Sequence, residues 1–359
     1  MTDSKRVPLD SAAAAKAAFA SVQDKPFPND IFTAPELRWA VIGCGVIANQ
    51  MAQSLALAGR KLAGVANRTL SKAQAFAEQY GIEKVYESVE DLYADPGIDA
   101  VYITTPHNTH ITYLRDALAA GKHVLCEKAI TLNSAELDEA RAIADEHNVV
   151  LMDATTVLHM PLYQELRRRM DAGEFGRMNL AQLNFGSYKE YGDLTNRFYN
   201  RNLAGGAMLD IGVYALSVMR LFMASQPIEV VSLGNTCETG VDVAGGIVCR
   251  NAEQQLGVVS LTLHSKQPKR SIISFDKCYI EVNEYPRADH ATIVWTADGH
   301  REEVHAGTEA YALCYEMADL EKAVAGDDSK RELLGYASDV MELMTKLRAD
   351  WGVVYPEEE

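Results

Sequence analysis

Three side chains in this sequence could move a proton and stabilise charge on a reacting oxygen. Lys128 follows the apolar run 123–126, while Asp210 and Tyr214 stand at positions i and i+4 of an apolar segment, a spacing that places both on one helix face. A partly desolvated lysine can donate to a substrate oxygen with its pKa shifted toward neutrality, and a phenol beside a cation can exchange a proton with its pKa drawn below about 10. We therefore expect Lys128 to polarise the substrate oxygen, Tyr214 to exchange the proton, and Asp210 to position or charge-balance the pair. The alternatives are a surface lysine, an aspartate that caps a turn and a tyrosine in the core.

A glycine-rich loop that could bind a pyrophosphate follows the first strand pattern. Gly43 allows a tight turn, Gly45 lets the main chain approach an anion, and Ala48 is small enough for helix and strand to pack closely. Free amides at the helix start, around Val46 and Ile47, would face the anion. Because strand and helix patterns flank this loop on both sides, we predict that it binds a dinucleotide rather than forming an ordinary tight turn.

The residues that select the cofactor's ribose are expected at the end of the second strand, about 20 to 25 residues further on. This sequence has Asn67 and Arg68 there, followed by Lys72, and no carboxylate that could accept from a 2′-hydroxyl. The planar donor fork of Arg68 suits a 2′-phosphate, so we predict NADP as the preferred cofactor, with NAD as the second choice. The alternative is that Arg68 is a solvated surface residue.

A polar segment after the strand pattern 100–103 is expected to line the cofactor. Its two histidines suggest a metal pair, but no cysteine or acidic partner lies nearby, so we predict no metal site. The residues expected to line the cofactor in this region are Thr104, Thr105, Pro106, His107, Asn108 and His110, together with Glu127 and Lys128.

The elements that carry these loops alternate between strand and helix. This alternation across residues 38–152 predicts an α/β fold, a doubly wound parallel Rossmann sheet with helices on both faces. Ligands of such sheets bind beyond the carboxyl ends of the strands, where the loops above lie. Ser71 is expected to cap one helix, and Gly81 and Gly121 to end two of them. The expected strands are 38–42, 62–66, 85–86, 100–103, 123–126 and 149–152, and the clearest helices are 71–80 and 110–120.

The second half of the chain has a different pattern. Strand patterns follow one another there without intervening helices, which predicts an α+β domain with a large, mostly antiparallel open sheet. Expected strands are 179–185, 228–238, 246–251, 256–265, 271–275, 279–285 and 292–295, and expected helices are 163–172, 207–223, 311–324 and 330–350. We divide the chain into an N-terminal arm at 1–35, with a helix over 9–22, a dinucleotide-binding domain at 36–152, and a substrate-binding and oligomerisation domain at 153–359. The last helices can pack back on the dinucleotide-binding domain.

Composition limits the partners of the chain. Its 359 residues include 34 Lys and Arg against 50 Asp and Glu, a formal net charge of −16, which repels nucleic acid and anionic lipid. No apolar run approaches the roughly 18 residues of a membrane span. The six cysteines are scattered without metal-ligand spacing, as in a reduced cytoplasmic protein. We therefore expect a cytoplasmic protein with a small-molecule substrate, no nucleic-acid partner and no membrane partner.

Taken together, these motifs resemble the Gfo/Idh/MocA family, over roughly residues 38–350, and most closely its branch around glucose-fructose oxidoreductase and dihydrodiol dehydrogenase. The motifs that carry the resemblance are 43–48, 105–106, 120–128 and 205–214. The resemblance implies an NAD(P)-dependent oxidoreductase that transfers hydride to or from a hydroxyl or carbonyl carbon of a sugar, polyol or related small molecule. It implies catalytic roles for Lys128 and Asp210, with Tyr214 as proton donor, and a homodimer or homotetramer formed through the C-terminal sheet.

The sequence departs from this family pattern at two positions. Ala129 replaces the proline that follows Glu-Lys in the family, which can loosen the main chain that aims Lys128. Leu158 stands where many members carry an arginine, so a substrate-side cation is missing, and either Arg197 or His159 is expected to replace it. The expected substrate contacts are Thr156, His159, Tyr188 and Arg197.

Two further functions remain open from the sequence. One is redox-assisted glycoside cleavage, in which a tightly held cofactor is reduced and reoxidised within one turnover. The other is a non-enzymatic sensor that binds NAD(P) and reports redox state to a protein partner. The presence of Lys128, Asp210 and Tyr214 together disfavours the sensor, which has no evident need for all three.

Overall fold

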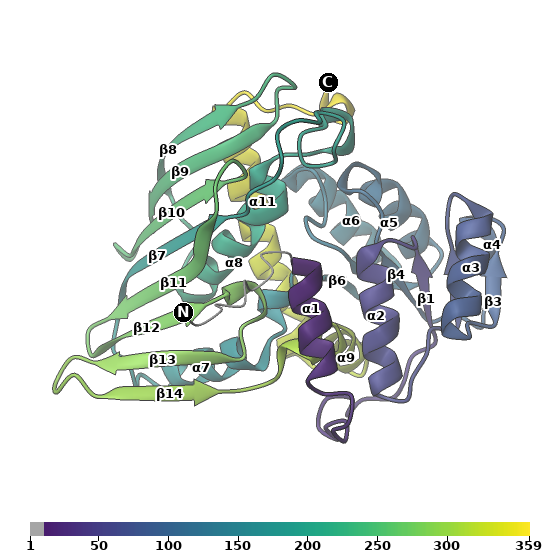
Figure 1. The fold of residues 1–359 in the computed structure, drawn as a ribbon, viewed down its shortest axis with the longest axis horizontal. Helices are drawn as coiled ribbons and strands as arrows, with labels where there is room; N and C mark the ends of the chain where they lie inside the picture. Colours follow the sequence, from purple (N-terminus) through teal and green to yellow (C-terminus); the bar gives the residue numbers. More distant parts are fainter. Residues whose placement is uncertain (1–10) are drawn as a thin grey trace, which may run out of the picture.

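The computed structural model describes residues 11–359, with side chains from residue 16 onward, and arranges them around two β-sheets (Figure 1). The first sheet has six strands in the order β3-β2-β1-β4-β5-β6, and all of its neighbouring strands run parallel. This confirms the predicted Rossmann sheet. Its strands are β1 Trp39–Ile42, β2 Gly64–Ala66, β3 Lys84–Tyr86, β4 Ala100–Ile103, β5 His123–Cys126 and β6 Leu151–Asp153.

Helices lie on both faces of the parallel sheet, because its central strands are buried on both sides and consist of apolar residues. Gly81 and Gly121 have φ angles of 65° and 75°, and both follow helix ends in the left-handed region as predicted. The predicted cap at Ser71 is wrong, since Thr69 precedes the helix and Ser71 lies inside its first turn. The helices of this part are α2 Val46–Leu57, α3 Leu70–Tyr80, α4 Val89–Ala94, α5 His110–Ala119 and α6 Ser134–Glu146.

The second sheet has eight strands in the order β14-β13-β12-β11-β7-β10-β9-β8, and only β7 and β10 pair in parallel. The predicted mostly antiparallel open sheet is thus confirmed. Edge strand β14 was not expected, because three of its five residues are charged and a fourth is histidine, a polar composition found on solvated edges. The strands are β7 Met178–Gly186, β8 Glu229–Thr236, β9 Asp242–Arg250, β10 Leu256–Thr262, β11 Gln267–Phe275, β12 Cys278–Asn283, β13 His290–Trp295 and β14 Arg301–His305.

Helices cover one face of the second sheet and leave the other face open (Figure 1). The covering helices are α7 Pro161–Asp171, α8 Val213–Phe222 and α11 Leu333–Asp350, with the short α10 Asp328–Arg331 before the last of them. α9 Ala312–Val324 instead packs on the parallel sheet, where Leu313 and Met317 share a core with Trp39. The division of the chain into domains stays a prediction, because the two sheets share packing elements.

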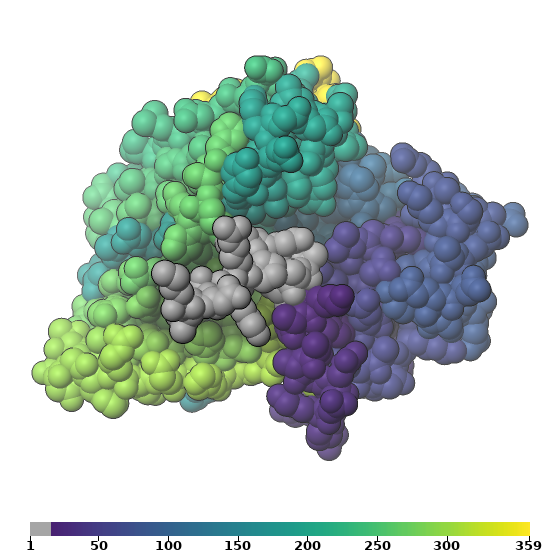
Figure 2. All heavy atoms as spheres, viewed as in Figure 1, coloured from purple at the N-terminus to yellow at the C-terminus, as the bar shows by residue number. Residues whose placement is uncertain are grey.

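The N-terminal arm packs against this junction. Helix α1 spans Ser11–Ala20, and residues 9 and 10 of the helix expected at 9–22 lie outside the described residues. Val22 and Ile31 are buried in the larger core. In the space-filling view the dark purple arm covers part of the boundary between the green sheet and the blue Rossmann part (Figure 2).

One helical run, residues 201–222, has the length and hydropathy of a membrane span, contrary to the expectation from sequence. Its 18-residue window has a mean hydropathy of 1.3, and 78% of that window is buried inside the protein. The run joins a short 3₁₀ turn, a π-helical turn and α8, and the π-helical turn and α8 pack beneath the second sheet. Its apolar character is therefore accounted for by core packing.

Candidate active site

A cavity of about 320 Å³ lies where the carboxyl ends of β1, β4 and β5 meet a loop of the second part. Its volume falls in the range typical of small-molecule sites. The parallel strands bring three separate loops to one edge of the sheet, as the sequence predicted. The cavity is lined by Gly45, Val46, Ile47, Thr104, Thr105, Pro106, His107, Glu127, Lys128, Arg197, Phe198, Leu203, Ala204, Gly205, Gly206, Asp210 and Tyr214.

Lys128 and Asp210 meet across this cavity. The Lys128 Nζ atom donates to the Asp210 main-chain oxygen at 2.6 Å and lies 3.2 Å from its carboxylate Oδ1. Arg197 also donates to Oδ1, at 3.2 Å. The Lys128 and Asp210 side chains are only 11% and 13% exposed, so these charges interact in a largely desolvated setting. The peptide bond between Lys128 and Ala129 is cis.

A π-helical turn presents Asp210 to the cavity. The turn spans Met208–Gly212 and continues directly into α8, which carries Tyr214. Asp242 accepts the Met208 N–H at 2.6 Å and so fixes the start of the turn. Gly206 has a φ angle of 125°, and a Cβ atom there would collide with Asp242 Oδ1. Wide helical turns of this kind are frequent at functional sites, since they re-aim a side chain within a helix.

Tyr214 lies beside the lysine. Its ring centre is 4.8 Å from Lys128 Nζ, and the ring packs against Phe185 with centroids 6.1 Å apart. Burial raises the pKa of the Tyr214 phenol, and the nearby Lys128 cation only partly opposes this. The expectation that its pKa falls below the usual value is therefore wrong.

The charge states of the other groups follow from the same burial. Burial lowers the pKa of Lys128, but its electrostatic interactions with Tyr214 and Asp210 raise that pKa by more, so the net shift is upward. The predicted shift of the Lys128 pKa toward neutrality is therefore wrong. Burial raises the pKa of Asp210, yet Lys128 and Arg197 leave it well below its usual range. Burial and Lys128 lower the pKa of His107 to about 3. At neutral pH the site holds a cationic lysine, an anionic aspartate, a neutral phenol and a neutral imidazole.

The glycine-rich loop fits an anion. Gly43 has a φ angle of 102°, and a Cβ atom there would lie 2.7 Å from Thr104 Oγ1, so the tight turn requires glycine. A Cβ atom on Gly45 would meet nothing within 4 Å, which leaves its main chain open to a ligand in the cavity. α2 begins at Val46, and Ala48 in its first turn is fully buried. The residues present therefore fit the pyrophosphate of a dinucleotide.

The residues predicted to select the ribose lie outside the cavity but beside the glycine-rich loop. The Gly43 N–H donates to Ala66 O at 2.9 Å, so the end of β2 adjoins the loop. Asn67 follows directly and donates to Thr69 O at 3.0 Å. Arg68 and Lys72 are exposed on the same edge.

The segment after β4 contributes both lining and support. Thr104, Thr105, Pro106 and His107 line the cavity, whereas His110 does not, because its two ring nitrogens bond Thr105 O at 2.8 Å and Ala129 O at 3.0 Å inside the core. Asn108 points elsewhere and donates to Asn202 O at 3.2 Å. Among residues 11–359 no group of His, Cys, Asp or Glu is arranged to hold a metal ion.

The four expected substrate contacts separate in the structure. Arg197 lines the cavity, while Tyr188 is 60% exposed and outside it. Thr156 and His159 are buried away from the cavity, and His159 bonds Asp319 Oδ2 at 3.1 Å and Asp153 O at 2.8 Å. Of the two residues expected to replace the missing cation, the structure brings Arg197 to the cavity and not His159.

Several lining residues were missed from sequence. Phe198, Leu203 and Ala204 are apolar residues within or just after a polar loop, and that contrast was the available signal. The Phe198 ring lies between two cations, with its centre 4.1 Å from Lys189 Nζ and 4.8 Å from Arg197 Cζ. Asp242 was missed as well, although an acidic residue between apolar residues at the start of a strand is a recognisable signal.

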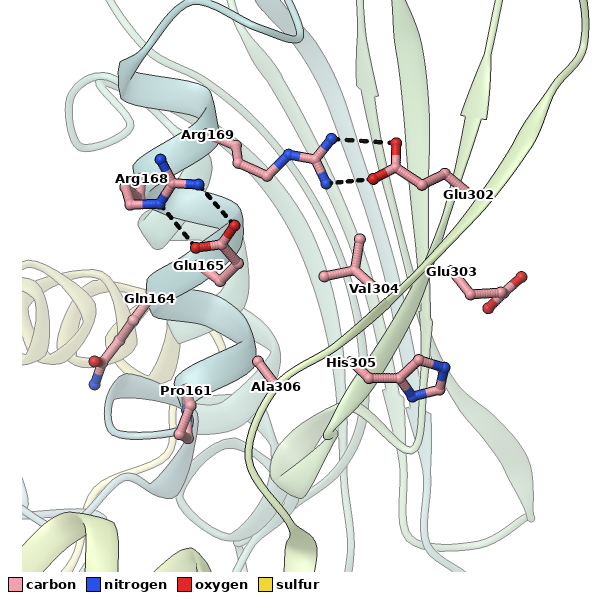
Figure 3. A pocket seen from close by; sticks show the side chains of 10 residues that line it. All are labelled: Pro161, Gln164, Glu165, Arg168, Arg169, Glu302, Glu303, Val304, His305 and Ala306. Carbon is pink, nitrogen blue, oxygen red and sulfur yellow. Dashed lines mark hydrogen bonds and ion pairs between the residues drawn. The ribbon is translucent and has the colours of Figure 1, made fainter. Parts of the chain in front are cut away.

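A larger hollow of about 680 Å³ lies between α7 and β14 (Figure 3). Four of its charged side chains pair with one another, with Arg169 bonded to Glu302 at 2.7 Å and Arg168 to Glu165 at 2.8 Å, while Glu303 accepts from Thr292 Oγ1 at 3.0 Å. Because these charges neutralise each other locally and the hollow is distant from the glycine-rich loop, we assign the chemistry to the smaller cavity.

Comparisons with known proteins agree with this arrangement. Residues 37–155 match an oxidoreductase family with an NAD-binding Rossmann fold, and residues 163–281 match the GFO/IDH/MocA C-terminal domain. The trans-1,2-dihydrobenzene-1,2-diol dehydrogenase of Mus musculus is 32% identical over 254 residues, covering 69% of this chain and 75% of the relative. The Sus scrofa enzyme of the same name is 28% identical over 340 residues, covering 90% and 99%.

Solved structures share the fold. A 3-ketoreductase from Actinomadura kijaniata in complex with NADP and TDP-benzene has a TM-score of 0.75 and 24% identity, covering 88% of this chain and 98% of that one. A levoglucosan dehydrogenase in complex with NADH and levoglucosan has a TM-score of 0.75 and 19% identity, covering 86% and 97%.

Proposed function

The chain belongs to the GFO/IDH/MocA family of NAD(P)-binding oxidoreductases that act on CH–OH groups, and from this premise we propose its reaction. It transfers a hydride between the nicotinamide and the hydroxyl or carbonyl carbon of a sugar, polyol or related small molecule. The observation that carries the proposal is the convergence of Lys128, Asp210 and Tyr214 on one cavity that also contains the open main chain of Gly45.

The cofactor has a defined set of candidate ligands. The amides at the start of α2, next to Gly45, would hold the pyrophosphate. Asn67, Arg68 and Lys72 would hold the 2′-phosphate, which supports NADP as the preferred cofactor. When bound, the nicotinamide supplies the site that donates or accepts the hydride.

The proton moves through Tyr214. In carbonyl reduction the substrate carbon gains the hydride while the neutral Tyr214 phenol gives its proton to the carbonyl oxygen. Lys128, a cation beside the phenol, stabilises the negative charge that develops on that oxygen and then on the phenolate. Asp210 anchors Lys128 through both of its oxygen contacts. In alcohol oxidation Tyr214 must first lose its proton, so the same residues act in reverse order.

Arg197 supports a substrate-recognition role. Its guanidinium lies at the mouth of the cavity, 61% exposed, with one contact to Asp210 and further donors available in its fork. We propose that it supplies the substrate-side cation that the family pattern places elsewhere and that Leu158 cannot provide. It would bind hydroxyl or acidic oxygens of the substrate.

The open face of the second sheet supports a homo-oligomer. Ile228, Val231 and Leu233 are 65%, 75% and 83% exposed on or beside the edge strand β8, and Val248 on the neighbouring β9 is 47% exposed. Apolar side chains grouped this way commonly mark a protein contact. We propose a homodimer or homotetramer that pairs through this face. The six free cysteines are consistent with a cytoplasmic location, which we also propose.

The experiment that tests the proposed reaction follows the cofactor's absorbance. The purified protein is mixed with aldoses, polyols, keto-sugars and trans-dihydrodiols, with NADP and NAD in separate series and Lys128→Met as control. Turnover that is stronger with NADP and absent in the control supports the proposal. Cleavage of a glycoside without net absorbance change would instead indicate internal redox cycling, and cofactor binding without any turnover would indicate a sensor.

A further inference from the structure

Residues 353–359 lie against two of the segments that build the cavity and against the start of α6, although they are distant from all three in sequence. We name this segment the clasp. Three of its residues, Val354, Tyr355 and Glu359, bond residues 201–205. Glu357 bonds the loop after β4, and Glu358 bonds Asn133 at the start of α6. The clasp therefore contacts segments next to the Lys128 loop and next to the π-helical turn that carries Asp210.

Tyr355 makes the central contact. It is fully buried, and its hydroxyl donates to Gly205 O at 2.7 Å. Gly205 lines the cavity and lies three residues before the π-helical turn that carries Asp210. The Tyr355 hydroxyl therefore holds a main-chain group of the cavity wall itself. The adjacent carbonyl, Ala204 O, lies 3.3 Å from His107 Nδ1, so successive peptides of this wall are each fixed from a different element.

Glu357 links the clasp to the loop after β4. It accepts from Asn108 Nδ2 at 2.7 Å, and the same amide donates to Asn202 O at 3.2 Å. Asn108 follows the lining residue His107, and Asn202 precedes the lining residue Leu203. One amide and one carboxylate thus connect the two sides of the cavity without entering it.

Buried charge holds the clasp itself in place. Glu358 bonds the guanidinium of Arg348 at 2.7 and 2.9 Å and accepts from Asn133 Nδ2 at 2.9 Å. Arg348 is 2% exposed, and its guanidinium lies 4.6 Å from the centre of the Tyr355 ring. A bidentate pair of this kind, buried and in contact with an aromatic face, fixes the orientation of Tyr355. The Tyr355 hydroxyl is therefore presented to Gly205 by a rigid base.

We propose that the clasp positions the cavity wall 203–206, and that Tyr355 and Glu357 are positioning residues for cofactor binding. The inference rests on the proposed use of this cavity as the cofactor site. Neither residue touches the reacting atoms, so their effect is exerted through Gly205 and Asn108. Loss of either contact frees the wall and weakens cofactor binding while leaving the Lys128–Asp210–Tyr214 group in place.

The test compares two buried tyrosines. Tyr355→Phe removes the bond to Gly205 O, and Tyr163→Phe removes a matched buried bond, from Tyr163 to Tyr285 O at 2.6 Å, outside the cavity lining. Without any cofactor, hydrogen exchange of peptides from 201–208 is expected to accelerate in Tyr355→Phe only. The Kd for NADPH, measured by fluorescence, should rise about 3- to 10-fold in Tyr355→Phe and less than about 2-fold in Tyr163→Phe.

A surface variant keeps the test informative if the buried change impairs folding. Glu357 is exposed, and Glu357→Ala removes the acceptor for Asn108, whereas Glu357→Gln retains one. We expect Glu357→Ala to raise the Kd and the cofactor KM more than kcat, and Glu357→Gln to restore them. The clasp is refuted if wild type binds NADPH while Tyr355→Phe and Glu357→Ala bind it equally well and leave exchange at 201–208 unchanged. If wild type binds neither NADPH nor NADH, the proposed site falls, and the clasp proposal with it.

Discussion

The two walls of the cavity are held by different kinds of interaction. On the Rossmann side, main-chain bonds continue the sheet into the loops, from Thr104 N to Ile42 O at 2.9 Å and from Glu127 N to Ile103 O at 3.0 Å. On the opposite side, main-chain bonds stay within the loop, such as Gly206 N to Phe198 O at 3.0 Å, and side chains from distant parts of the chain attach the loop to the rest of the protein. Asp242 fixes Met208, and Tyr355 fixes Gly205.

This difference has a consequence for how each wall responds to mutation. A ladder of main-chain bonds depends little on any one side chain, so the Rossmann wall should tolerate most substitutions outside its glycines and His110, whose ring bonds Thr105 O and Ala129 O. The opposite wall depends on single carboxyl and hydroxyl groups, whose loss leaves a main-chain group unpaired. The proposed catalysis requires both walls, because Lys128 belongs to the first and Asp210 to the second.

The largest effect is expected where the walls meet. Lys128→Met removes the cation that stabilises charge on the substrate oxygen, and we expect kcat to fall by about 10³-fold or more. The Kd for NADPH should change less than about 2-fold, because the pyrophosphate loop is untouched. Steady-state kinetics and fluorescence titration measure the two quantities.

Lys122→Met is the matched control for this lysine. Lys122 is also largely buried in the Rossmann part, but it donates to Asp95 O and Ile98 O, both at 2.8 Å, away from the cavity. The Lys122→Met variant should be less stable than wild type and should keep the wild-type kcat. Retention of more than a tenth of wild-type kcat by Lys128→Met would contradict the assigned role.

Tyr214→Phe tests proton transfer in the second wall. We expect a fall in kcat of about 10²-fold, within the usual contribution of general acid catalysis. Because the pKa of the phenol is raised by burial, alcohol oxidation should accelerate with pH throughout the range from 7 to 10. Carbonyl reduction needs the protonated phenol and should stay level over that range. A phenylalanine variant that kept the rising profile would show that another group titrates.

The sequence predicts the first wall better than the second, for the same reason that the two walls differ. The glycine-rich loop and the strand ends are local patterns, so Gly45, Thr104 and Lys128 could be placed from sequence. Asp210 and Tyr214 were found because polar groups at helical spacing stand out in an apolar segment. The predicted pKa directions of Tyr214 and Lys128 were wrong, because the burial and the charges around both groups depend on tertiary contacts.

The residues that hold the second wall could not be derived from local pattern. Tyr355 is 150 residues from Gly205, and Asp242 is 34 residues from Met208. No periodicity indicates which distant side chain bonds a given main-chain group. His159 shows the converse error, since its proposed role rested on proximity in sequence to a departure from the family pattern, and the fold places it in the core.

Asp242 gives a smaller, thermodynamic test of the second wall. Burial raises the pKa of its carboxyl to about 6, above the value near 3.8 of an exposed aspartate. The folded state therefore holds this proton more tightly, and its stabilising effect is present below about pH 4 and lost as the pH rises through 6. Asp242→Asn removes this titration and retains an acceptor for Met208 N–H.

The measurement for Asp242 is the free energy of unfolding in urea at pH 4 to 7. The free energy of the variant minus that of wild type should increase by about 2 kcal/mol over that range. Asp153, whose buried carboxyl also has a pKa of about 6, is present in both proteins and cancels in the difference. Parallel curves would show that Asp242 does not titrate with folding.

The smallest effect is expected at the outer end of the first wall, where Arg68 is exposed beside the glycine-rich loop. Arg68→Ala should raise the Kd for NADP about 10-fold, the cost of a lost charge-assisted contact at an exposed site, and leave the Kd for NAD unchanged. Lys61→Ala is the control, because Lys61 is equally exposed but pairs with Glu83 at 2.7 Å. An equal loss of affinity for NADP and NAD would mean that Arg68 acts only through its positive charge and does not recognise the 2′-phosphate. If the Kd for neither cofactor changes, Arg68 is a solvated surface residue. The preference for one cofactor would then have to come from Asn67 or Lys72.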